Sequence, residues 1–184
     1  MKLTTKEIII TAMFTSLTSL GAYISIPLGE VPITLQTLFV LLSGLILGHK
    51  LGALSQLTYL ILGLIGLPIF STFSGGLQSV MKPSFGFIVG FVFSAYIVGK
   101  IAYIKKGSST INIWLASSVG TIIIYLFGIP YMYYILNIVL DRGLSFSTVF
   151  KIGCLVFLPG DILKLIVASF VAQKILPIVK IVDK

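Results

Sequence analysis

The chain has 184 residues, of which 57% are hydrophobic and only 10% are charged. Soluble domains have an apolar share of about 45–50%, so this composition excludes a soluble protein and predicts an all-α integral membrane protein with room for about six helical spans. The net charge is +8, but the thirteen Lys and Arg residues stand at the ends of apolar segments rather than in one stripe. We therefore expect a single transmembrane domain over residues 1–184 that contacts the lipid bilayer and binds no nucleic acid.

The first apolar run, Ile8–Ile26, follows Lys2 and Lys6. A positive start before an apolar run also occurs in cleaved signal peptides, but this run is long enough to cross about 28 Å as a helix and further runs follow it, so we expect a retained span. Ala12 and Ser16 form, with the nearby Thr11, Thr15, Thr18 and Ser19, a small-residue face of the kind on which membrane helices pack closely. The face can meet another helix of this chain or another subunit, and the residues alone favour the first.

A turn bounded by two prolines, Pro27–Pro32, leads into two apolar runs, Ile33–Gly48 and Leu51–Phe70. Only two residues separate these runs, so we expect a tight antiparallel hairpin. Thr34 and Gln36 lie at the start of the first run. The side chain of Gln36 can hydrogen-bond within or between helices, or it can line a pocket, and the sequence leaves both roles open.

The longest polar interruption of the chain is Ser71–Lys82. Its paired glycines allow the backbone to fold over a pocket or to open from it, and an ordinary loop is the alternative. We favour a lid because Phe73, Ser79 and Lys82 combine aromatic and polar groups, as small-molecule sites do.

Two further spans are predicted at Ser84–Ile104 and Ile111–Leu136, the second ending in an aromatic belt that includes Tyr131. The segment Ser145–Val156 is too short to span once its lysine is counted. We expect it to be an interfacial helix or a re-entrant piece. It leads into the sixth span, predicted at Pro159–Val179.

One carboxylate and one ammonium, those of Asp161 and Lys164, stand at the start of this last span. Pro159 and Gly160 suit a helix start, and the spacing of three residues places both charged groups on one face. They can be a helix cap and a snorkelling neighbour. Because Lys164 lies one turn inside an apolar run, a purely structural pair would be costly in lipid, and we expect both groups to point into one pocket.

The positive charges predict the orientation in the membrane. With the amino terminus inside, nine of the thirteen fall on the inner face, three on the outer face, and Lys164 in the membrane. Both termini are then cytoplasmic, and the candidate polar residues gather at the outer end. The inner residues are Lys2, Lys6, Lys50, Lys100, Lys105, Lys106, Lys174, Lys180 and Lys184, and the outer ones are Lys82, Arg142 and Lys151.

Enzyme signatures are absent from the sequence. It has no HExxH, GxSxG, Walker A or Asp-rich prenyl-diphosphate pattern, and Asp161 is the only carboxylate inside a span. One cysteine and one histidine exclude a Cys/His zinc cluster. We therefore expect no catalytic activity, no cofactor and no metal, and any uphill transport needs an ion gradient or another subunit.

Four stretches together resemble the BioY family, the biotin-binding S components of energy-coupling factor (ECF) transporters. They are Val31–Leu38 (VPITLQTL), Leu51–Gln56 (LGALSQ), Gly66–Pro68 (GLP) and Phe157–Lys164 (FLPGDILK). The resemblance covers nearly the whole chain. It implies a six-helix membrane fold, biotin held near the extracellular face, and energy from two ABC ATPase subunits recruited through a transmembrane T component.

Two positions depart from the family pattern. S components dock through an A-x-x-x-A face, which corresponds here to Ala12 and Ser16, with Ser in place of the second Ala. The segment Met81–Gly86 departs from the glycine-rich form of the family, so Lys82 is not carried over as a family residue. The resemblance thus implies subunit docking by Ala12 and Ser16.

Biotin suits these residues chemically. Its ureido ring has two N–H donors and one carbonyl, its bicycle is apolar and its tail is an anion. We expect Asp161 to accept from a ureido N–H, Lys164 to donate to a ligand oxygen, and Lys82 to attract the tail. An S component for another vitamin, a stand-alone ion-coupled carrier and a small intramembrane enzyme are the alternatives. The candidate ligand-binding residues are Asp161, Lys164, Thr34, Gln36, Phe73, Ser79, Lys82 and Tyr131.

Overall fold

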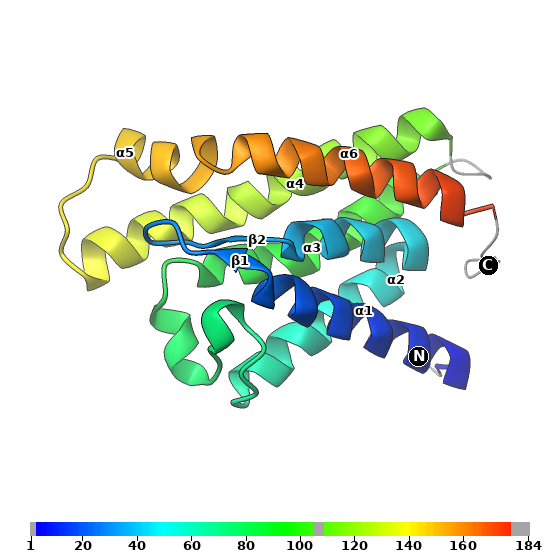
Figure 1. Ribbon diagram of the computed structural model, residues 1–184, viewed down its shortest axis with the longest axis horizontal. Coiled ribbons are helices and arrows are strands. Elements are labelled where there is room, and N and C mark those ends of the chain that lie inside the picture. Colours follow the sequence, from blue (N-terminus) through cyan, green and yellow to red (C-terminus); the bar gives the residue numbers. More distant parts are fainter. Residues whose placement is uncertain (1–2, 105–108, 178–184) are drawn as a thin grey trace.

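Helices that run along one long axis form most of the molecule (Figure 1). The computed structural model describes residues 3–104 and 109–177. In chain order the elements are α1 (Thr5–Tyr23), β1 (Ser25–Ile26), β2 (Ile33–Thr34), α2 (Gln36–Leu64), the 3-10 turns η1 (Ser71–Phe73) and η2 (Leu77–Met81), α3 (Phe85–Ala102), α4 (Thr110–Tyr134), the π-helical turn η3 (Ile135–Val139), α5 (Phe146–Phe150), the π-helical turn η4 (Lys151–Leu155) and α6 (Leu158–Ile175).

Helix α1 is shifted toward the amino terminus relative to the predicted run Ile8–Ile26. A capping box sets its start, because the Thr4 N–H donates to the Glu7 carboxylate at 2.7 Å and the Glu7 N–H donates to the Thr4 hydroxyl at 3.3 Å. The predicted run ends in β1, which pairs antiparallel with β2. The predicted turn Pro27–Pro32 is the loop between these two short strands.

Helix α2 is a hairpin, as the sequence predicts. The chain reverses at Gly48, where φ is 76° and ψ is 178°, a backbone conformation that is essentially restricted to glycine. The halves, residues 36–47 and 49–64, pack antiparallel. The Gln36 amide donates to the Tyr59 hydroxyl at 2.7 Å, and the Gln56 amide donates to the Ser43 hydroxyl at 3.2 Å.

A buried polar cluster fixes α1 against this hairpin. Gln56 is fully buried, and its amide also donates to the hydroxyls of Thr18 and Ser55, both at 3.2 Å. The Thr15 hydroxyl donates to the Ser55 carbonyl at 2.9 Å. Because such groups are satisfied inside the bundle and not by lipid, they hold α1 in one orientation.

Small residues allow the central helices to approach closely. A Cβ at Gly44 in α2 would lie 2.6 Å from the Ala95 carbonyl oxygen of α3, and a Cβ at Gly120 in α4 would lie 2.3 Å from the Val98 side chain. The backbones of α2, α3 and α4 therefore pack at distances that only glycine permits.

The carboxyl-terminal part agrees with the predicted short piece followed by a sixth span. The segments Phe146–Leu155 and Leu158–Ile175 meet at a bend of 40°. Helix α6 begins one residue before Pro159, which occupies its first turn. The predicted end of the span, Val179, lies outside the described residues.

Within the described residues, three helices are long and apolar enough to cross a membrane. They are Gln36–Leu64, Phe85–Ala102 and Thr110–Val139, and the bent pair that ends in α6 makes a fourth if it is one span. Helix α1 is not among them, because Lys6, Glu7 and several hydroxyl residues reduce its hydropathy. Counting the two halves of α2 separately, and α5 with α6 as one bent unit, gives the six helices that the sequence predicts.

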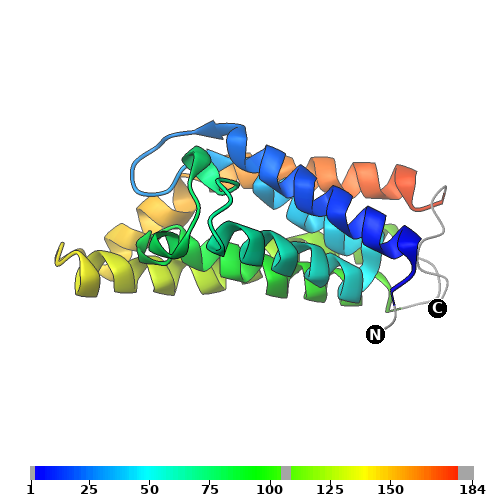
Figure 2. The same cartoon turned by 90° about the horizontal axis from the view of Figure 1, so that it is seen from below.

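Basic residues lie at both ends of the bundle. The start of α1, the turn at Gly48 and the end of α6 share one end, whereas the β1–β2 loop, η1, η2 and the α4–α5 turn occupy the other (Figures 1 and 2). The first end carries Lys6, Lys50, Lys100 and Lys174, and the second carries Lys82, Arg142 and Lys151. Five predicted inner lysines, Lys2, Lys105, Lys106, Lys180 and Lys184, lie outside the described residues.

Replacing Gly48 by Ala tests the hairpin. We expect Gly48→Ala to lower the free energy of unfolding by about 1–3 kcal/mol, because a Cβ is disfavoured at this φ and ψ. Thermal unfolding of the detergent-solubilised protein measures the loss. Gly160→Ala is the control, because its Cβ would meet only the end of the Lys164 side chain, at 3.9 Å. Equal melting temperatures for the two variants would contradict the requirement for glycine at the reversal of α2.

Candidate functional site

A pocket opens at the end of the bundle that holds the β1–β2 hairpin. It contains about 540 Å³ of open space, its mouth included. Strand β2, the first turns of α2, α3 and α6, and the middle of α4 contribute to it, so helices far apart in the sequence build one site. Its lining residues are Val31, Pro32, Thr34, Gln36, Thr37, Ser71, Ser84, Phe87, Ile88, Phe91, Ile124, Tyr125, Phe157, Asp161 and Lys164.

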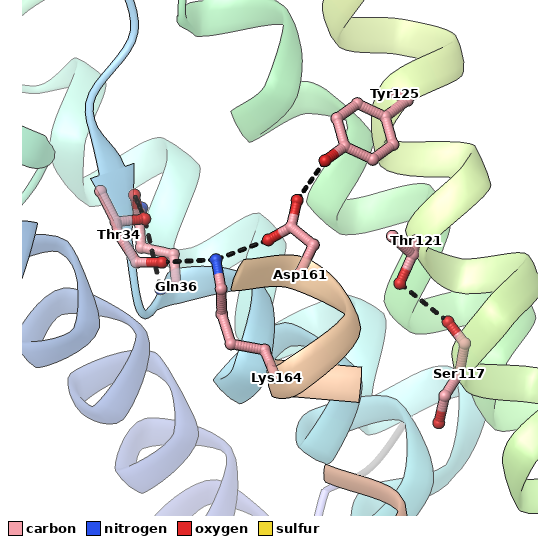
Figure 3. Close-up of polar contacts among 7 residues, drawn as sticks. All are labelled: Thr34, Gln36, Ser117, Thr121, Tyr125, Asp161 and Lys164. Atoms are coloured by element: carbon pink, nitrogen blue, oxygen red, sulfur yellow. Dashed lines mark hydrogen bonds and ion pairs between the residues drawn. The ribbon is translucent and has the colours of Figure 1, made fainter. Parts of the chain in front are cut away.

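A buried ion pair lines this pocket (Figure 3). Asp161 and Lys164 are only 6% and 7% exposed, and Lys164 Nζ lies 2.5 Å from Asp161 Oδ1. Their spacing of three residues in the first turns of α6 places both on the face that meets α2 and α4. The prediction that both charged groups point into one pocket is confirmed.

Further hydrogen bonds hold each member of the pair from a different element. The Lys164 ammonium donates to the Thr34 carbonyl of β2 at 2.8 Å. The Tyr125 hydroxyl of α4 donates to Asp161 Oδ2. Each carboxylate oxygen thus has one donor, and because a carboxylate accepts up to about four hydrogen bonds, Asp161 keeps capacity for a ligand.

The packing of α4 against α6 sets the distance between Tyr125 and Asp161. Eight residues earlier in α4 and eight later in α6, the Ser169 hydroxyl donates to the Ser117 hydroxyl at 3.0 Å. Two contacts in the same antiparallel register thus fix these helices over about 12 Å. This packing of α4 against α6 directs the Tyr125 hydroxyl toward the Asp161 carboxylate.

Gln36 connects the pocket to the neighbouring parts of the same end of the bundle. Its amide oxygen accepts from the Thr34 hydroxyl at 3.0 Å, and its NH₂ donates to the Tyr59 hydroxyl at 2.7 Å. The Tyr59 hydroxyl in turn donates to the Ile69 carbonyl at 3.0 Å, directly before η1. Both roles that the sequence leaves open for Gln36 are present, because the residue lines the pocket and also bonds across the α2 hairpin.

Aromatic and aliphatic side chains make the remaining wall of the pocket. Phe87 and Phe91 come from α3, Ile124 from α4, and Phe157 from the residue before α6. The Phe87 ring stands edge-on to the Tyr125 ring, with 6.2 Å between centroids. A hydrogen-bonding charged pair beside an apolar wall suits a small molecule with a polar head and an apolar body.

Four of the eight predicted ligand-binding residues line this pocket: Thr34, Gln36, Asp161 and Lys164. Phe73 does not; it is 68% exposed and stacks on the Tyr23 ring at 4.5 Å. The hydroxyl of Ser79 is buried and has no hydrogen-bond partner among the described residues.

The two other predicted residues also lie outside the pocket. Tyr131 donates its hydroxyl to the Val80 carbonyl at 2.5 Å and packs against Phe85. Lys82 lines a second, neighbouring hollow. Ligand contacts by Phe73, Ser79, Lys82 and Tyr131 stay predictions.

The segment Ser71–Lys82 lies beside the mouth of the pocket. Its first residue, Ser71, lines the pocket, and so does Ser84, two residues after its last. Inside it, Thr72 and Phe73 adopt positive φ values of 59° and 53°, which are uncommon for residues with side chains. The position suits a lid, which stays a prediction.

Sequence reasoning missed Tyr125 and the aromatic wall. A phenol in the middle of a long apolar run was the available signal for Tyr125, because such a hydroxyl needs a buried partner. Its partner Asp161 is 36 positions away, and only the register of α4 against α6 brings the two together. For Phe87 and Phe91 no signal separates a pocket wall from a lipid-facing surface.

The first helix presents Ala12 and Ser16 outward. Both are exposed, whereas Thr11, Thr15 and Thr18 face the bundle. The Ser16 hydroxyl donates to the Ala12 carbonyl of its own helix at 3.0 Å. Within the predicted small-residue face, Thr15 and Thr18 make the internal contact that the residues alone favour, whereas Ala12 and Ser16 do not.

The model of the BioY family matches residues 1–181. The chain belongs to the BioY family. The resemblance of its four sequence stretches to this family is thereby confirmed, and the match includes every residue that lines the pocket.

Relatives in the BioY family agree over almost their whole lengths. The probable biotin transporter BioY of Pyrococcus horikoshii is 40% identical over 92% of this chain and 96% of its own length. That of Lysinibacillus sphaericus is 38% identical over 93% of this chain and 87% of its own length. The biotin transporter BioY of Thermotoga maritima is 38% identical over 92% and 95%.

A solved structure has the same fold. The crystal structure of the S-component for biotin from an ECF-type ABC transporter matches with a TM-score of 0.69 and 28% identity, over 95% of this chain and 94% of that chain. The predicted class, an all-α membrane bundle of the ECF S-component type, is confirmed.

Removing one member of the buried pair tests its energetics. We expect Lys164→Met to lower the free energy of unfolding by about 3 kcal/mol, because it leaves a buried carboxylate without its cation. The double variant with Asp161→Asn should regain most of this loss. Chemical unfolding in detergent measures both.

Arg142→Met is the matched control for this experiment. It breaks the Glu30–Arg142 ion pair, whose side chains are 27% and 50% exposed, and such exposed pairs contribute under about 1 kcal/mol. If Lys164→Met and Arg142→Met lower the free energy of unfolding equally, the buried pair stabilises the protein no more than the exposed pair does.

Proposed function

We propose that this chain is the high-affinity biotin-binding membrane subunit, or S component, of an ECF-type ABC vitamin transporter. It captures biotin at the extracellular face for ATP-driven uptake. The observation that carries the proposal is the buried Asp161–Lys164 pair, which borders an aromatic-walled pocket in a chain of the BioY family.

The ligand's chemistry matches the two parts of the pocket. A ureido N–H donates to the free lone pairs of Asp161, and the Lys164 ammonium donates to a ligand oxygen. Tyr125 orients the carboxylate, while Thr34 and Gln36 flank the pair. The apolar bicycle then packs against Phe87 and Phe91, which supply the aromatic wall.

The segment Ser71–Lys82 acts in this proposal as the lid. Its ends border the mouth of the pocket, so a small rotation of the segment changes the access of a ligand. Phe73 and Ser79 come close to the ligand only if the lid moves, because neither lines the pocket.

Partners and orientation complete the proposal. The subunit is one transmembrane domain of the cell membrane, with both termini cytoplasmic, because positive charge predominates at that end. It docks through the exposed face around Ala12 and Ser16 of α1 onto a T component, which joins it to two ABC ATPase subunits. Exposed Ile9 and Met13 widen this apolar face.

The alternatives differ in what they bind and what drives them. An S component for another vitamin would prefer that vitamin to biotin, and an ion-coupled carrier would concentrate biotin in vesicles that lack ATPase subunits. The relatives are transporters rather than enzymes, so no turnover of the ligand is expected.

Biotin binding by the purified chain tests the proposal. We expect biotin to bind more tightly than riboflavin or thiamine, and Asp161→Asn to weaken it by about 1.5–3 kcal/mol through loss of a hydrogen bond to a charged group. Isothermal titration in detergent measures both. Asp141→Asn, in the exposed α4–α5 turn, is the control and should bind as the parent does. Unchanged affinity in Asp161→Asn would remove Asp161 from the site.

A bulky residue on α1 tests the docking face. Ser16→Trp should abolish co-purification with the T component and ATPase subunits while biotin affinity is kept, because Ser16 is exposed and remote from the pocket. Ile122→Trp, on the exposed face of α4, is the control and should assemble normally. Assembly of the Ser16→Trp variant at the parental level would contradict the assignment.

A further inference from the structure

A second hollow lies beside the pocket and is lined mainly by polar and loop residues. It contains about 500 Å³ of open space, its mouth included. Its walls come from the β1–β2 loop, from η1 and from the residues that precede α3. The lining residues are Pro27, Gly29, Glu30, Pro32, Ser71, Thr72, Lys82, Pro83 and Ser84.

The two hollows adjoin each other. Pro32, Ser71 and Ser84 line both of them. A ligand whose polar head meets the Asp161–Lys164 pair must direct its other end toward the mouth, because the pair occupies one wall of the pocket. The second hollow therefore receives whatever extends beyond the pocket.

Charges of both signs line the second hollow. The Lys82 ammonium has no hydrogen-bond or ion-pair partner among residues 3–104 and 109–177. Glu30 holds Arg142 through Oε1 at 2.7 Å, and its carboxylate has further acceptor capacity. A zwitterionic group, with one carboxylate and one ammonium, complements this combination, whereas an apolar group does not.

We propose that the second hollow is a subsite for a diamino acid that is joined to the tail of the ligand by an amide bond through its side-chain amine, so that its α-carboxylate and α-ammonium both stay free. The chain then binds such biotin amides as well as free biotin. The Lys82 ammonium donates to the carboxylate of the amino acid, and Glu30 faces its ammonium. The inference rests on the proposed function, because the ring must occupy the first pocket.

Amide formation leaves recognition of the ring unchanged. The ureido group that meets Asp161 is far from the tail, and the amide replaces only the tail anion by a neutral link. An amino acid restores an anion beyond that link. In the amide, the carboxylate of the amino acid takes the place of the biotin carboxylate as the anion that Lys82 attracts.

Two biotin amides that differ in one group test this assignment. Biotinyl-lysine, joined through the side-chain amine of lysine, carries a free carboxylate and a free ammonium. Biotinyl-cadaverine is the same amide without the carboxylate. Titration of the full chain in detergent should give a roughly two- to fivefold tighter dissociation constant for biotinyl-lysine, as for a partly exposed ion pair. Lys82→Gln should reduce this ratio to one, and Lys82→Arg should keep it.

Lys151→Gln is the matched control, since Lys151 is exposed at the same end and lines neither hollow. It should keep the parental ratio. Binding of biotinyl-cadaverine to Lys82→Gln shows that the variant is folded.

Equal affinities of the two amides in the parent, or a ratio that survives Lys82→Gln, would overturn the subsite. Failure of both amides to bind while biotin binds would also overturn it, with the proposed function intact. If biotin itself fails to bind, the proposed function fails.

Discussion

The pocket end of the molecule depends on one buried ion pair. Asp161 and Lys164 stand in the first turns of α6, and neither is stable there alone, because an unpaired charge at this depth costs several kcal/mol. Three elements supply what the pair needs: α6 supplies the spacing, β2 the Thr34 carbonyl, and α4 the Tyr125 hydroxyl. The pair thus joins segments 130 and 36 residues apart into one site. Its remaining hydrogen-bond capacity faces the pocket.

The fold serves to bring these segments together at one end. The reversal at Gly48 returns α2 to the end of the bundle that holds the pocket, where Gln36 and Tyr59 meet. Close packing of α3 and α4 around glycines brings Phe87 and Phe91 into the lining of the same pocket. The α1 helix is held by its inner hydroxyl face, which leaves Ala12 and Ser16 exposed. These two residues do not line the pocket, so the proposed ligand site and the proposed docking face share no residue.

The sequence predicts the local features well and the tertiary ones poorly. Apolar runs, prolines and glycines indicate the helices and the α2 hairpin, and the cost of charge in lipid singles out Asp161 and Lys164. The role of Tyr125 depends on the register of α4 against α6, which no local pattern encodes. On α1, the residues alone do not separate Thr15 and Thr18, which pack inward, from the exposed Ala12 and Ser16, because small residues and hydroxyl residues both suit close packing. Phe73 and Tyr131 have the right chemistry for a pocket, but no local pattern shows that their rings pack outside it, on Tyr23 and Phe85.

A structure of the protein with biotin bound tests the central claim most directly. The account predicts the ureido group within about 3 Å of the Asp161 carboxylate, with the Lys164 ammonium on a ligand oxygen and the tail directed toward Lys82. Biotin bound elsewhere, or in the pocket with Asp161 and Lys164 still closed on each other and no contact to the ligand, would contradict it.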